Sequence, residues 1–154
     1  MQVLCGTDIV DVKRIEAALK SNARFAEKVF TVAEIKYCES KNAGKYQSYA
    51  ARFAAKEAYL KALGVGISGS ASLADVEVVN DEITGRPTLC LHGGAAETYT
   101  ARRGESLSVS ISHTAETAIA IVVILCGGPD ASYEQTAKLI NNIFYGASNK
   151  NYIV

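Results

Sequence analysis

The chain has 154 residues, of which 49% are hydrophobic and 21% are charged. These proportions are typical of globular proteins, and the length is that of one ordinary domain with a substantial core. The 16 basic residues balance 16 acidic ones, so the charge gives no reason to expect a protein that binds nucleic acid or membrane surfaces. No apolar run is long enough to span a bilayer, and Met1 to Val10 lacks the basic segment of a secretory signal. We therefore expect a cytoplasmic protein.

The first half of the chain predicts one buried strand and three helices. An apolar run at residues 3–10 is typical of a buried strand, although the carboxylate of Asp8 interrupts it. Asp11 can cap the first helix, and a Thr-x-x-Glu capping box at residues 31–34 begins the second. The third helix signal is the strongest because the segment is rich in alanine, and Gly64 is well placed to end it. The three helices are expected at about residues 11–20, 31–40 and 46–63.

The second half of the chain predicts strands that pair with one another. Residues 76–79 and 87–91 are strand signals separated by a turn that contains glycine. Residues 94–103 predict a short helix. Residues 107–112 alternate apolar and hydroxyl side chains, and residues 117–125 form a further strand signal. This mixture of antiparallel strands and helices indicates the α+β class.

The cysteines and histidines argue against a disulfide or metal scaffold. The four cysteines are far apart and form no Cys-x-x-Cys pair: Cys5, Cys38, Cys90 and Cys126. Three of them lie in apolar runs, a distribution typical of buried, reduced thiols. The chain has only two histidines, so a histidine-based metal cage is not expected.

Two carboxylates are candidates for holding a hard cation. Asp8 stands in an apolar strand, where a lone buried carboxylate is costly, unless it lies at the strand end and caps the turn. Glu57 flanks the apolar stripe of the long helix, one turn before Lys61, and could instead form a solvated ion pair worth about 0.2–0.5 kcal/mol. If the carboxylates meet, they offer the oxygen ligands that Mg²⁺ prefers beside substrate phosphates. Lys61 could then neutralise charge on a phosphate or a leaving group.

Two further motifs leave alternatives open. Residues 64–69 read Gly-x-Gly-x-x-Gly, but they follow a helix rather than a strand, which argues against a dinucleotide-binding fold. Such a loop could still let the backbone approach a phosphate closely. Residues 110–113 read Ser-Ile-Ser-His, and they form either a solvated hydroxyl face with a turn histidine or a contact to phosphate or ribose. The chain has no nucleophile elbow of the kind found in hydrolases.

Taken together and in this order, these segments resemble the holo-acyl-carrier-protein synthases, the small trimeric type of 4'-phosphopantetheinyl transferase. The matching segments are Gly6-Thr7-Asp8-Ile9-Val10 with Arg14-Ile15, Phe30-Thr31 with Glu34 and Cys38, Arg52-Phe53-Ala54-Ala55-Lys56-Glu57-Ala58 with Lys61-Ala62 and Gly64-Val65-Gly66, and Ser110-Ile111-Ser112-His113. They cover about residues 3–125, and the motif of the central helix is the most specific of them.

The resemblance implies a fold and an activity. The implied fold is the α+β phosphopantetheinyl-transferase fold, with an antiparallel sheet and one long central helix, in a homotrimer whose active sites lie between subunits. The implied reaction moves 4'-phosphopantetheine from coenzyme A to a serine of apo acyl carrier protein and releases 3',5'-ADP, a step of fatty acid biosynthesis. Mg²⁺ is the implied cofactor. Coenzyme A and the carrier protein are the implied partners.

The resemblance also assigns roles to individual residues. Asp8 and Glu57 are expected to bind the metal and, with Lys61, to be catalytic. Glu57 would accept the proton of the carrier serine, directly or through a water. The residues expected to bind coenzyme A are Arg52, Lys61, Gly64, Ser112, His113 and Thr114. Arg14 and Arg24 are expected to face acidic residues of the carrier protein.

The chain departs from the family pattern after Cys126. We expect residues 1–126 to form the transferase domain and residues 127–154 to form a C-terminal extension. Residues 133–144 are amphipathic and predict a short helix in this extension, and a loose polar tail follows. Two other functions stay open: a non-catalytic oligomeric protein that binds coenzyme A or a nucleotide, and a structural subunit that assembles through the C-terminal helix.

Overall fold

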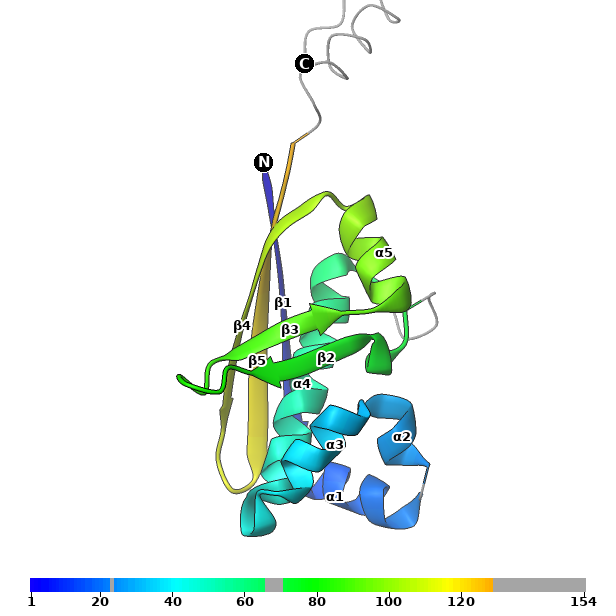
Figure 1. The fold of residues 1–154 in the computed structure, drawn as a ribbon, viewed down its shortest axis with the longest axis vertical. Coiled ribbons are helices and arrows are strands. Elements are labelled where there is room, and N and C mark those ends of the chain that lie inside the picture. Colours follow the sequence, from blue (N-terminus) through cyan, green and yellow to red (C-terminus); the bar gives the residue numbers. More distant parts are fainter. Residues whose placement is uncertain (23, 66–70, 129–154) are drawn as a thin grey trace, which may run out of the picture.

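The computed structural model describes residues 1–22, 24–65 and 71–128 of the chain (Figure 1). In chain order the elements are β1 (Gln2–Asp11), α1 (Val12–Ser21), α2 (Phe25–Val29), α3 (Val32–Glu39), a 3-10 turn (Asn42–Gly44), α4 (Lys45–Leu63), a second 3-10 turn (Leu73–Asp75), β2 (Val76–Asn80), β3 (Pro87–Leu91), α5 (Gly93–Ala101), β4 (Gly104–His113) and β5 (Thr117–Cys126). Helices and antiparallel strands are thus combined in the α+β class that the sequence predicts. No helix of the described ranges has the length and hydropathy of a membrane span.

A three-stranded antiparallel sheet in the order β1–β5–β4 supports the fold. β5 lies in the middle, so that Asp8 of β1 and Ile111 of β4 both stand opposite Ala120. One face of β5 is fully buried and packs against α4, which runs along the sheet (Figure 1). The other face is turned away from the helix. Side chains alternate between these two faces along each strand, and the alternation determines which residues can reach α4.

Gly6 brings β1 and α4 into close contact. Many residues of α4 are buried alanines, whose small side chains allow the helix to lie close to the sheet. A Cβ atom on Gly6 would overlap with the carbonyl oxygen of Ala58 and the backbone nitrogen of Ala62. Glycine is therefore the residue that fits beneath α4 at this position. Because Gly6 and Asp8 are two residues apart in a strand, they lie on the same face, and this close approach also brings Asp8 to the helix.

The β2–β3 hairpin crosses α4 (Figure 1) and is fixed to it through Lys56. Lys56 is completely buried, and its ammonium group donates hydrogen bonds to Glu34 Oε2 at 2.8 Å, to the carbonyl oxygen of Leu73 at 3.1 Å and to that of Val76. Glu34 also accepts a hydrogen bond from the backbone nitrogen of Val78 at 2.9 Å. One buried ion pair thus connects α3, α4 and β2.

The predicted elements are confirmed with small shifts of their ends. Asp11 caps α1 by accepting a hydrogen bond from the backbone nitrogen of Lys13 at 2.8 Å, and the predicted capping box begins α3. Gly64 ends α4 in the left-handed conformation, with φ of 68°. Residues Phe25–Val29 form α2, a helix that the sequence motifs do not predict. The loop at residues 66–69 and the expected C-terminal helix lie outside the described residues.

The prediction that the cysteines are buried is wrong for two of the four. Cys38 and Cys126 are buried, whereas Cys5 and Cys90 are exposed, and all four are free thiols. Cys5 lies on the face of β1 turned away from α4, and Cys90 lies on the outward face of β3. An apolar run shows that a segment forms a strand, but it does not show which faces of that strand are covered.

Candidate functional site

Asp8, Glu57 and Lys61 lie where β1 passes α4. Asp8 is inside the strand, and Asp11 caps the following turn, so the capping alternative for Asp8 is wrong. Asp8 Oδ1 accepts a hydrogen bond from Lys61 Nζ at 2.7 Å. The side chain of Asp8 is 13% exposed and that of Lys61 is 54% exposed. Lys61 therefore covers the carboxylate of Asp8 from the solvent side.

Glu57 is partly buried beside this pair. Burial raises the pKa of Glu57 above its ordinary value, and the negative charge of Asp8 raises it further, whereas Lys61 and Arg14 lower it. The predicted alternative of a solvated Glu57–Lys61 pair is not what the structure has, because the ammonium group of Lys61 is hydrogen-bonded to Asp8. Burial and the neighbouring carboxylate of Asp8 thus outweigh the opposing charges of Lys61 and Arg14 in their effect on the pKa of Glu57.

This set of donor atoms fits a hard divalent cation. Mg²⁺ prefers carboxylate oxygens and is commonly held by one or two carboxylates together with waters and substrate phosphates. A cation between Asp8 and Glu57 would remove the repulsion that raises the pKa of Glu57. Lys61 adds a positive charge on the exposed side, where phosphate groups of a substrate can approach.

Arg52 and His113 line a different place, a crevice of about 200 Å³ between α4, the β2–β3 hairpin and β4. The guanidinium of Arg52 stacks 3.9 Å from the ring centroid of Tyr37 and donates a hydrogen bond to Asn80 Oδ1 at 2.6 Å. Arg52 is only 5% exposed, and its Nε is buried without a hydrogen-bond partner among the described residues. A buried guanidinium that has a hydrogen-bond donor without a partner is well suited to bind a phosphate group.

The roles of Tyr37 and Asn80 are not predicted by any sequence motif. Both contact Arg52 from other elements, α3 and β2, and lie far from it in the chain. The local sequence around either residue carries no signal for this contact. Only the packing of the hairpin and α3 against α4 brings the three side chains together.

Ser112, His113 and Thr114, which are expected to bind coenzyme A, do not all lie on one surface. Ser112 lies on the sheet face turned away from α4, and His113 lies on the face toward it. Thr114 is in the β4–β5 turn, where its hydroxyl accepts hydrogen bonds from the backbone nitrogens of Glu116 and Thr117 at 3.2 and 3.1 Å. Within one chain, these three residues do not form a single cluster with Lys61.

The three remaining residues with predicted roles are Gly64, Arg14 and Arg24, which belong to or adjoin three different helices. Gly64 ends α4 shortly after Lys61, in a conformation that favours glycine. Arg14 is an exposed residue of α1 whose charge acts on Glu57. Arg24 is exposed at the start of α2. Arg14 is therefore electrostatically part of the carboxylate cluster, although its expected role is to face a partner.

The sheet face turned away from α4 is apolar and exposed. Its exposed large side chains are Val3, Ile9, Ile119, Ile121 and Val123. Serines of β4 stand in register beside them, and a hollow of about 450 Å³ opens over Ser108, Ser110, Ile121 and Val123. An apolar patch of this kind commonly marks a surface where another protein binds.

Comparison with known proteins shows the family to which this chain belongs. A family model described as the 4'-phosphopantetheinyl transferase superfamily matches residues 4–122. The holo-[acyl-carrier-protein] synthase of Ruminiclostridium cellulolyticum is 50% identical over 128 residues, which are 82% of this chain and 95% of that protein. The chain therefore belongs to the holo-[acyl-carrier-protein] synthases of that superfamily, as the sequence motifs predict.

Solved structures of related enzymes agree with this assignment. The Helicobacter pylori holo-[acyl-carrier-protein] synthase in complex with coenzyme A is 36% identical and superimposes with a TM-score of 0.68, over 79% of this chain and 100% of that one. The Bacillus anthracis enzyme in complex with CoA (3',5'-ADP) is 35% identical, with a TM-score of 0.67, over 80% of this chain and 96% of that one. The predicted fold is therefore confirmed.

Proposed function

We propose that this chain transfers the 4'-phosphopantetheine group of coenzyme A to a serine of apo acyl carrier protein and releases 3',5'-ADP. Membership of the synthase family supports the proposal, and the related Helicobacter pylori structure contains coenzyme A. The observation that carries it for this chain is the meeting of Asp8, Glu57 and Lys61, from two elements, at one partly buried place.

Asp8 and Glu57 are the residues that would hold Mg²⁺. When bound, this ion supplies positive charge that neutralises pyrophosphate oxygens and polarises the attacked phosphorus. Lys61 turns from Asp8 to the phosphates and offsets the charge that grows on the leaving 3',5'-ADP. Its exposed side chain has the freedom for this movement. Gly64 bears no side chain that would hinder the approach of coenzyme A to the end of α4.

The reaction also requires an acceptor for the proton that the carrier serine loses. The hydroxyl oxygen of the carrier serine forms a bond to the phosphorus next to pantetheine, and the bond from that phosphorus to the bridging pyrophosphate oxygen breaks. The serine proton passes to Glu57, directly or through a water. Because a bound cation would remove the repulsion that raises the pKa of Glu57, a water beside Glu57 is the better immediate acceptor of this proton.

The complete site forms between subunits of a homotrimer. In one chain, the crevice with Arg52 and His113 is separate from the carboxylate cluster. The exposed apolar sheet face offers a surface for association, and it carries Ser112. In the trimer, Arg52, Ser112, His113 and Thr114 of one subunit would bind the nucleotide part of coenzyme A at the neighbour's carboxylates.

The carrier protein approaches from the side of α1. Arg14 is exposed there, and its charge already acts on Glu57. Acidic residues of the carrier that pair with Arg14 and Arg24 would thus bring the carrier serine near the carboxylate cluster. Pairing between exposed charges contributes more to the rate and orientation of encounter than to affinity.

Residues 1–126 suffice for the activity, and residues 127–154 form an extension. The family model ends at residue 122, and the match to the Ruminiclostridium cellulolyticum protein spans 95% of that protein. We expect a chain that ends at Cys126 to retain transfer activity. Loss of assembly without loss of chemistry in that truncated chain would assign the extension to an interface.

The test is transfer to a carrier protein. The purified chain is mixed with coenzyme A, Mg²⁺ and apo acyl carrier protein, and mass spectrometry follows the addition of phosphopantetheine to the carrier. We expect Asp8→Asn and Glu57→Gln to abolish the addition with unchanged circular dichroism, and the exposed control Glu82→Gln to retain it. If calorimetry shows coenzyme A binding but no carrier is modified, while an active enzyme works in parallel, the chain is a binding protein and the proposal is wrong.

A further inference from the structure

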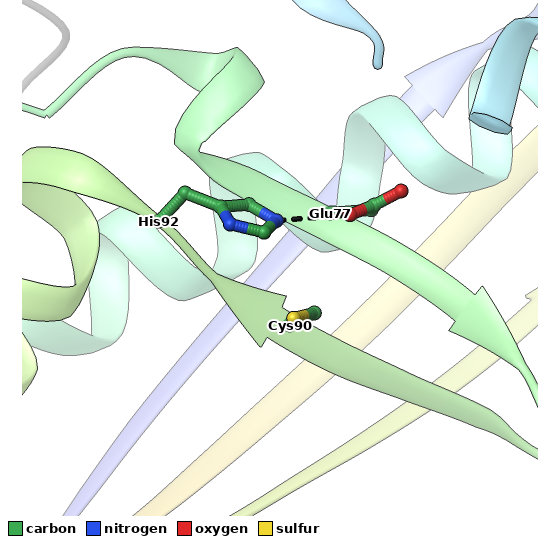
Figure 2. A group of neighbouring side chains, drawn as sticks. All are labelled: Glu77, Cys90 and His92. Atoms are coloured by element: carbon green, nitrogen blue, oxygen red, sulfur yellow. Dashed lines mark hydrogen bonds and ion pairs between the residues drawn. The ribbon is translucent and has the colours of Figure 1, made fainter. Parts of the chain in front are cut away.

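Three side chains with different metal-binding atoms meet on the outward side of the β2–β3 hairpin. Glu77 lies on β2, Cys90 on β3, and His92 directly follows β3 (Figure 2). A carboxylate oxygen, the thiol sulfur and an imidazole nitrogen all lie within 4.8 Å of one another. His92 Nε2 is 2.9 Å from Glu77 Oε2. The proposed transfer reaction does not use these three residues.

The pairing of the two strands produces this arrangement. Glu77 stands directly opposite Cys90 in the antiparallel register, so their side chains share one face of the hairpin. His92 is two residues after Cys90 and returns to the same side, where it begins α5. The opposite face of β2, with Val76 and Val78, is buried in the core. The cluster therefore lies on rigid elements and is open to solvent.

Thr31 orients the carboxylate of the cluster. Its hydroxyl donates a hydrogen bond to Glu77 Oε1 at 2.9 Å, which leaves Oε2 to face His92. A hydrogen bond to the outer oxygen of a ligating carboxylate is typical of metal sites, where it holds the ligand in place. Thr31 is itself fixed because it caps α3.

We propose that Glu77, Cys90 and His92 form a second metal site, which binds Zn²⁺ with a water as the fourth ligand. Thiolate, imidazole and carboxylate together select a borderline-soft ion such as Zn²⁺ rather than Mg²⁺. Zinc–ligand bonds of about 2.0–2.3 Å place tetrahedral ligand atoms about 3.3–3.8 Å apart. Small side-chain rotations would therefore bring the ligand atoms of Glu77, Cys90 and His92 from their observed separations to these distances. On binding, the Cys90 thiol releases its proton to solvent, and the ion replaces the His92–Glu77 hydrogen bond.

The bound ion would connect β2, the end of β3 and the start of α5, and through Thr31 it would act on α3 as well. Because the ion binds the folded hairpin and the unfolded chain lacks the preformed cluster, it would raise thermal stability. This effect does not depend on the transfer reaction, since Asp8 and Glu57 are not part of the cluster.

Cobalt substitution tests the proposal directly. The metal-free protein is titrated with Co²⁺, whose tetrahedral thiolate complexes have strong visible bands and a sulfur-to-cobalt charge-transfer band. We expect the charge-transfer band to reach saturation, to be bleached by added Zn²⁺, and to be lost in Cys90→Ser. His92→Ala should weaken binding about tenfold or more.

Two control variants separate this site from others. Cys5→Ser removes the other exposed thiol, and Asp8→Asn alters the proposed magnesium site; both should retain the cobalt spectrum of the wild type. Zn²⁺ should raise Tm in the wild type but not in Cys90→Ser. A titration without saturation, or the same charge-transfer band in Cys90→Ser as in the wild type, would overturn the proposal.

Discussion

Lys56 and Glu34 form a salt bridge of 2.8 Å in which both side chains are completely inaccessible to solvent. The ammonium group finds three acceptors, because two backbone carbonyls complete its hydrogen bonds. Burial lowers the pKa of Lys56, and the charge of Glu34 opposes this shift. Removing one member of such a pair leaves a buried charge without compensation. The pair is therefore expected to be essential for stability although it takes no part in the chemistry.

Glu34→Gln should lower the free energy of unfolding by about 3–5 kcal/mol, as measured by urea denaturation. The matched control is Glu16→Gln, which breaks the exposed pair of Glu16 with Lys20 on α1 and should cause no clear loss. Equal stability losses in the two variants would show that the buried pair has no special importance.

Gly6→Ala should destabilise the chain by about 3 kcal/mol or more, because its Cβ would overlap with the backbone of α4 at Ala58 and Ala62. Thermal unfolding followed by circular dichroism measures the loss. Gly44→Ala is the control, since an added Cβ there meets nothing within 4 Å. We also expect residual folded Gly6→Ala protein to transfer poorly, because Asp8 is displaced from α4. A Tm for Gly6→Ala equal to that of Gly44→Ala would contradict the close packing.

Glu57→Gln should stabilise the protein at neutral pH when divalent ions are removed by a chelator. The pKa of Glu57 is raised above its ordinary value of 4.5 in the folded chain, so the folded state holds the proton more tightly than the unfolded state. Stability in the wild type therefore falls as the pH rises from 4.5 through the raised pKa. The gain from Glu57→Gln should be absent below that window and complete above it.

Urea unfolding at several pH values measures this effect, with the exposed Glu82→Gln as a control that should show no such pH dependence. Mg²⁺ should then stabilise the wild type and leave Glu57→Gln almost unchanged, since the ion would bind the carboxylate that the variant lacks. If the chelated Glu57→Gln protein is less stable than the wild type at neutral pH, the two carboxylates do not repel each other as described.

Ile121→Arg should separate the proposed trimer into monomers and abolish transfer, because it places a charge on the exposed apolar sheet face. Light scattering coupled to gel filtration measures the assembly, and circular dichroism verifies the fold. Ile83→Arg is the control, since Ile83 is 94% exposed in the β2–β3 turn. An active trimer of Ile121→Arg would exclude this face as the interface.

The helix ends and the site motifs could be predicted from the sequence. A cap or a left-handed helix end involves residues within about four positions of one another, as at Asp11, Thr31 and Gly64. Asp8 was recognised because a carboxylate in an apolar strand is costly, and Glu57 because its motif is specific. Each of these signals is contained in a short segment, so it can be recognised before the fold is known.

Contacts between distant segments were decided by the tertiary structure. Lys61 pairs with Asp8 instead of Glu57, Glu34 is a buried ion-pair partner as well as a cap, and Cys90 is exposed beside Glu77 and His92. The physical reason is the distance along the chain over which each kind of interaction acts. Capping and strand alternation arise from hydrogen bonds and sterics within a few residues, whereas strand register and the side of the sheet covered by α4 depend on packing across the whole domain.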